Sequence, residues 1–147
     1  MAPRPLHAVP ALTAVLLLAS GCGDAEPAEP DRGKVFAADR PAIEVAAGAE
    51  FSIRVEDNPS TGMTWIVEDP QPDPAVARFQ DSRYQPSASG EGKAGAGGTR
   101  DLTFRAEAAG QTRIALRRCL PTSCTNGEIR PGQEQDVQHL SYTLTVR

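Results

Sequence analysis

A period-two alternation of apolar and polar residues recurs along this chain and constrains its fold more than any other feature. The alternation covers residues 51–56, 63–68, 102–106, 112–117 and 140–146. Successive side chains of a β-strand point to opposite faces of a sheet, so each run predicts a half-buried strand. Residues 43–46 and 76–80 add two shorter candidates, and no long helical period follows residue 22. About seven short strands separated by turn residues predict an all-β fold, a β-sandwich.

The N-terminal segment is predicted to lie outside this fold. Residues 1–21 contain Arg4, an apolar run and the small residues Ala19-Ser20-Gly21, which is the pattern of a secretory signal peptide, too short for a membrane span. Small residues leading into Cys22 resemble the lipobox of bacterial lipoproteins. That resemblance implies cleavage before Cys22, lipidation of its thiol and an extracytoplasmic protein anchored to the membrane of a bacterial cell envelope. The alternative is a plain secreted protein with a free Cys22.

Residues 22–33 are rich in Ala, Glu and Pro and predict a disordered tether, which leaves residues 34–147 for the domain. In an oxidising compartment the two other cysteines, Cys119 and Cys124, are predicted to form a disulfide. It would close a small loop, with a stabilisation of at most about 2–3 kcal/mol. A redox-active pair is disfavoured because the spacing is not C-x-x-C.

The composition narrows the classes of function. The net charge is −4 and no basic cluster is present, which argues against a nucleic-acid partner. After residue 22 the sequence has a single histidine, His139, and it offers no ligand set for a metal. The sequence therefore predicts a protein that is not an enzyme and needs no cofactor.

The stretch Asp57–Trp65 contains the most distinctive loop. Pro59 fixes its own backbone, Gly62 can take a positive φ, and Ser60 and Thr61 are small and polar. Such a loop can enter a narrow cleft while losing little conformational entropy. Trp65 is predicted to lie in the core.

Two further connections are expected at the same end of the sandwich. Residues 82–98 are rich in Gly, Ala and Ser and predict a long flexible segment, within which residues 85–98 are the loop expected at this end. Residues 119–136 hold the predicted disulfide. Loops at one end of a rigid sandwich are a common place for a binding site.

These segments resemble the chagasin-type inhibitors of papain-like cysteine peptidases. Asn58-Pro59-Ser60-Thr61-Gly62 with Trp65 is similar to the family's N-P-[ST]-T-G-x-x-W motif. Gly95-Ala96-Gly97-Gly98 is similar to its glycine-rich second loop, and Ala108-Ala109-Gly110 to its A-x-G turn. The family's Arg-Pro-Trp motif is missing: Arg118 with Leu120-Pro121 is the nearest counterpart, and Arg130-Pro131 is a later one.

The resemblance implies an immunoglobulin-like sandwich that inhibits its peptidase reversibly and competitively, as a monomer, by occluding the active-site cleft with three loops. Thr61 would lie nearest the catalytic cysteine. The residues expected to contact the peptidase are Asn58, Pro59, Ser60, Thr61, Gly62, Gly95, Ala96, Gly97, Gly98, Arg118, Leu120 and Pro121. The alternative function is a cell-envelope module that binds a protein or glycan and has no peptidase target.

Overall fold

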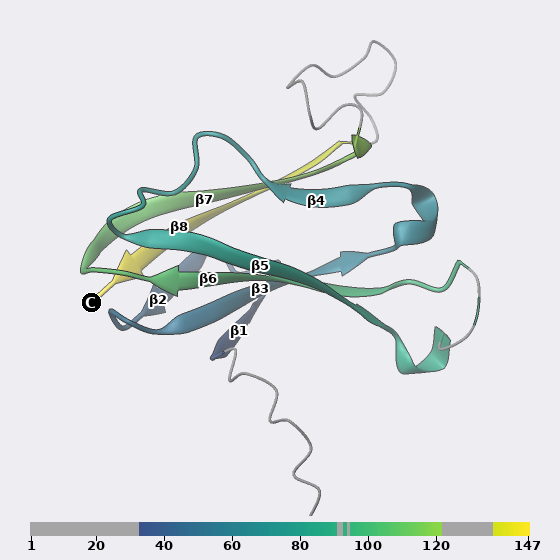
Figure 1. Cartoon of the computed structure of the whole chain (residues 1–147), viewed down its shortest axis with the longest axis horizontal. Helices are drawn as coiled ribbons and strands as arrows, with labels where there is room; N and C mark the ends of the chain where they lie inside the picture. Colours follow the sequence, from purple (N-terminus) through teal and green to yellow (C-terminus); the bar gives the residue numbers. More distant parts are fainter. Residues whose placement is uncertain (1–32, 91–92, 94, 122–136) are drawn as a thin grey trace, which may run out of the picture.

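Eight strands within the described residues form two stacked four-stranded sheets (Figure 1). The computed structural model describes residues 33–90, 93, 95–121 and 137–147. One sheet has the order β1-β3-β6-β5 and the other the order β2-β8-β7-β4. The strands are β1 Lys34–Ala37, β2 Ala42–Val45, β3 Glu50–Asp57, β4 Thr64–Val67, β5 Ala77–Pro86, β6 Gly98–Ala106, β7 Gly110–Cys119 and β8 Gln138–Val146. The predicted all-β sandwich is confirmed.

The core lies between the two sheets and is filled by the alternating apolar residues. Phe51 of β3 stacks on Phe104 of β6, with ring centroids 5.6 Å apart. Trp65 is 6% exposed and belongs to the same core, as predicted, and its indole Nε1 donates a hydrogen bond to the carbonyl oxygen of Glu56 at 3.0 Å. The indole therefore ties β4 to β3 directly below the loop that joins them.

The chain connections divide between the two ends of the sandwich (Figure 1). The β3–β4 connection, with the short 3-10 helix η1 (Pro59–Thr61), and the β5–β6 connection lie at one end. The turn between β6 and β7 and the C-terminus lie at the other end. The topology thus brings residues 58–62 and the glycine-rich residues to the same end, as the sequence predicts.

The prediction of a long flexible segment at residues 82–98 is wrong over much of its length. Strand β5 continues to Pro86 and pairs antiparallel with β6, with Gln85 opposite Thr99 and Pro86 opposite Gly98. The register shifts between Phe79 and Asp81. Strand β5 is an edge strand whose middle is exposed, so it has little apolar alternation by which it could be recognised.

Several predictions fall on parts of the chain that the structure does not describe. They are the signal peptide (residues 1–21), the tether (residues 22–33, apart from Gly33), Cys22, Cys124 and the Arg130-Pro131 pair. Where the chain is described, none of its helices has the length and apolar character needed to span a membrane.

Candidate functional site

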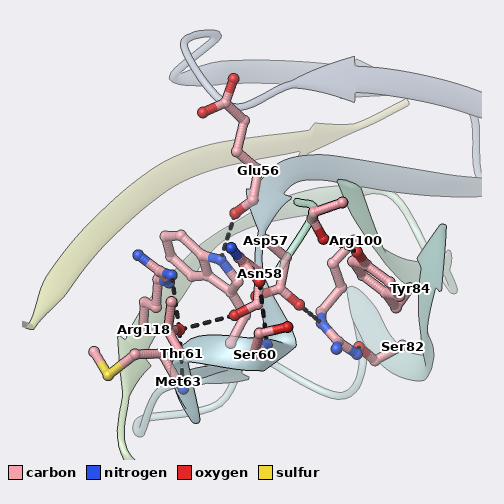
Figure 2. Close-up of polar contacts among 12 residues, drawn as sticks. Glu56, Asp57, Asn58, Ser60, Thr61, Met63, Ser82, Tyr84, Arg100 and Arg118 are labelled. Atoms are coloured by element: carbon pink, nitrogen blue, oxygen red, sulfur yellow. Dashed lines mark hydrogen bonds and ion pairs between the residues drawn. The ribbon is translucent and has the colours of Figure 1, made fainter. Parts of the chain in front are cut away.

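The tip loop (residues 58–62) is a closed, hydrogen-bonded turn (Figure 2). Asn58 caps η1: its side-chain oxygen accepts from the backbone N–H of Ser60 at 3.1 Å. Pro59 begins the helix, where its missing N–H costs nothing. Gly62 ends it at a φ of 74°, a left-handed conformation that favours glycine, and donates to Pro59 O at 3.0 Å. The motif residues therefore specify a rigid turn.

The two hydroxyl groups of the tip loop have different roles. The Thr61 hydroxyl donates to Asn58 O at 2.8 Å and accepts from the backbone N–H of Met63 at 3.3 Å. Arg118 Nη2 approaches the same oxygen at 3.5 Å. The Ser60 side chain is exposed, and its hydroxyl has no hydrogen-bond partner in the part of the chain that the structure describes. Ser60 is thus free to meet a partner, while the Thr61 hydroxyl holds the turn.

The glycine segment (residues 95–98) lies beside the tip loop. Asn58 Nδ2 donates to the carbonyl oxygen of Gly95 at 3.1 Å, so one side chain joins the two loops. Gly95 has a φ of 80° and open space around it. Gly98, however, is the first residue of β6 and not part of a loop: a Cβ there would lie 2.1 Å from Gln85 O. Close pairing with β5 explains this glycine.

The roots of both loops meet at a buried ion pair. Asp57, the last residue of β3, accepts a 2.7 Å hydrogen bond from Arg100 Nε. Arg100 also donates to Ser82 Oγ at 3.1 Å and its guanidinium lies 5.9 Å from the ring centroid of Tyr84 (Figure 2). Local sequence patterns do not reveal this cluster, because its residues are scattered along the chain.

A third segment, the β7 exit (residues 118–121), lies beside the tip loop. Arg118 is opposite Trp65 in the β4–β7 ladder, and Leu120 Cδ2 would be 3.7 Å from a Cβ built at Gly62. Pro121 is exposed and Cys119 is buried. The structure therefore brings the residues predicted to contact a peptidase, in the tip loop, the glycine segment and the β7 exit, to one end of the sandwich. Cys22 and Cys124 lie outside the described residues.

An open cleft of about 610 Å³ lies between the loop roots, lined by both loops, Arg118 and Gln138. Its lining mixes acidic, basic, amide and hydroxyl groups. No cluster of three His, Cys, Asp or Glu side chains that could hold a metal occurs within the described residues.

Fold and site together define a β-sandwich that places the tip loop, the glycine segment and the β7 exit side by side at one end. Residues 44–145 match the sequence model of the chagasin family peptidase inhibitor I42. The chain belongs to this family, and it is accordingly a peptidase inhibitor and not an enzyme.

Solved structures show the same fold in distant proteins. The cysteine protease inhibitor EhICP2 from Entamoeba histolytica is 18% identical, with a TM-score of 0.58 over 78% of this chain and 95% of that chain. The solution structure of Amebosin is also 18% identical, with a TM-score of 0.55 over 78% of this chain and 98% of that chain. No curated protein matches the sequence significantly.

Proposed function

We propose that this chain inhibits papain-like cysteine peptidases, reversibly and competitively, by inserting the tip loop into the active-site cleft. The glycine segment and the β7 exit would contact the walls of that cleft. Family membership supports inhibition of a peptidase. EhICP2, which shares the fold, is described as a cysteine protease inhibitor.

The observation that carries the proposal is the closed geometry of the tip loop. Residues 59–61 form a 3-10 turn with both ends capped, and they are not an extended strand. Pro59, Ser60 and Thr61 are exposed and small. Such a turn can fill a cleft without offering an extended peptide bond for cleavage, and its rigidity lowers the entropy lost on binding.

The direct test is a titration of papain with residues 22–147 carrying Cys22→Ser. We expect half-maximal inhibition below about 1 µM, with the apparent KM raised and kcat unchanged, because the loops and the substrate compete for one cleft. Trypsin, a serine peptidase, serves as the control and should keep its activity. Full papain activity at micromolar inhibitor would contradict the proposal.

A non-peptidase partner in the cell envelope is the second candidate. It is favoured by one observation, the missing Arg-Pro-Trp motif, because a buried aromatic anchor is often worth about 2 kcal/mol or more. Capture of a non-peptidase envelope protein, lost when residues 118–121 are replaced, together with a failed papain titration, would select it.

We also propose that the protein is a monomer of the bacterial cell envelope, anchored by a lipid on Cys22. The proposal includes a disulfide between Cys119 and Cys124. Support comes from the small residues before Cys22, and from the even number of cysteines left once Cys22 is lipidated.

Intact mass spectrometry of the protein from a lipoprotein-processing bacterium tests both modifications. We expect an N-terminal Cys22 with a diacylglyceryl mass, and no alkylation of Cys119 or Cys124 before reduction. The Cys22→Ser variant should leave the membrane fraction. A native Cys22 without added mass, or two free thiols, would contradict the respective assignment.

A further inference from the structure

The Asp57–Arg100 ion pair lies between the sheets, directly beneath the two loops. The side chain of Asp57 is 0% exposed and that of Arg100 is 17% exposed, with 2.7 Å between Oδ2 and Nε. The other carboxylate oxygen of Asp57 is buried and has no hydrogen-bond partner among the described residues. Compensation for this buried charge therefore depends on Arg100, and loss of either partner leaves an uncompensated group.

Further contacts of Arg100 extend from this pair to the glycine segment. Its guanidinium lies over Tyr84, and the Tyr84 hydroxyl donates to the carbonyl oxygen of Ala96 at 3.4 Å. Asp57 itself directly precedes Asn58, whose side chain reaches Gly95 O. The tip loop and the glycine segment are thus joined twice, near their tips by the Asn58–Gly95 hydrogen bond and at their roots by the Asp57–Arg100 pair (Figure 2).

We propose that Asp57 and Arg100 are positioning residues, which fix the tip loop relative to the glycine segment and so set the affinity for the peptidase without touching it. This inference rests on the proposed function. Both side chains are too buried to offer a partner much contact area. Their effect would come from pre-organisation, because loops already held in their bound arrangement lose less entropy on association.

The same two strands provide a matched control pair. Arg54 of β3 and Asp101 of β6 form a two-pronged ion pair, with both nitrogen–oxygen distances at 2.7 Å. The hydrogen bonding of Arg54 to the Asp101 carboxylate, which accepts from Arg54, raises the pKa of Arg54. Alternation along a strand places Arg54 and Asp57 on opposite faces of the sheet. The control pair therefore lies on the outer face of the sheet, whereas Asp57 and Arg100 lie on the face toward the core.

The test compares two sets of variants. The first set is Asp57→Asn, Arg100→Gln and the double variant of this pair. The second set is the control: Asp101→Asn, Arg54→Gln and the double variant of that pair. The readouts are papain inhibition, unfolding in urea, and hydrogen exchange of the Thr61 and Gly62 amides in the free protein. Both pairs should lower stability. Only the Asp57–Arg100 variants should weaken inhibition, by about tenfold or more at temperatures where they are folded, and accelerate exchange at those two amides relative to core amides.

Equal effects of the two pairs on inhibition at matched stability, or unchanged exchange in the tip loop, would overturn the proposal. If Asp57→Asn does not fold, Arg100→Lys keeps the charge but loses the hydrogen-bonding fork, and the same comparison applies. A wild-type protein that does not inhibit papain would contradict the proposed function, while the exchange measurement would still decide whether the ion pair orders the tip loop.

Discussion

Ser60→Lys is expected to weaken inhibition of papain by more than about 100-fold while leaving the fold unchanged. Ser60 is exposed at the apex of the turn, and its hydroxyl makes no hydrogen bond to the described residues, so the substitution breaks no internal contact. A lysine side chain there would project into the cleft that the small tip is proposed to fill. The measurements are the inhibition constant and the midpoint of urea unfolding.

The matched control is Ala109→Lys, which adds the same charge to an exposed residue of the turn at the opposite end of the sandwich (Figure 1). It should inhibit like the wild type. Thr61→Lys would also remove hydrogen bonds within the turn, because the Thr61 hydroxyl donates to Asn58 O and accepts from the backbone N–H of Met63. A loss of inhibition by that variant could therefore come from a changed turn. If Ser60→Lys and Ala109→Lys inhibit equally well, the tip loop is not the contact surface.

The fold could be predicted from the sequence wherever a strand has one buried face. Residues 51–56 and 140–146 alternate clearly, and they belong to β3 and β8, which are inner strands of their sheets. Trp65 could be placed in the core on the same grounds. Most of the tip loop could also be predicted, since Pro59 and Gly62 act through local backbone geometry that does not depend on the rest of the chain.

A strand that depends on its neighbour could not be predicted in this way. The part of β5 from Asp81 to Gln85 is polar, and its structure comes from pairing with β6 and not from a buried face of its own. Strand β1 is only four residues long and gave no clear alternation. The second half of β5, from Ser82 to Pro86, was therefore mistaken for part of a flexible segment.

The ion pair beneath the candidate site could not be predicted from the sequence either. Asp57 and Arg100 are 43 positions apart, and they meet only because the register of β3 and β6 puts Asp57 opposite Gly98. Nothing in the local sequence distinguishes this pair from other charged residues. A side-chain contact across a sheet depends on register, which alternation alone does not fix.

Gly98→Ala is expected to lower the free energy of unfolding by about 3 kcal/mol. The added Cβ would lie 2.1 Å from the carbonyl oxygen of Gln85 and 2.9 Å from Pro86 Cα, and both of these are backbone atoms that cannot turn aside. It would also lie 2.8 Å from the Tyr84 hydroxyl. The end of the β5–β6 ladder must open to admit one methyl group. Urea unfolding measures the loss.

Gly97→Ala is the control for Gly98→Ala, because it adds the same methyl group one residue earlier. Its Cβ would be 3.5 Å from Asp57 O, an ordinary van der Waals contact, so stability should stay within about 0.5 kcal/mol of the wild type. If the two variants are equally stable, close strand pairing does not explain Gly98. If only Gly98→Ala is destabilised, the close pairing of β5 and β6 requires glycine at position 98 but not at position 97.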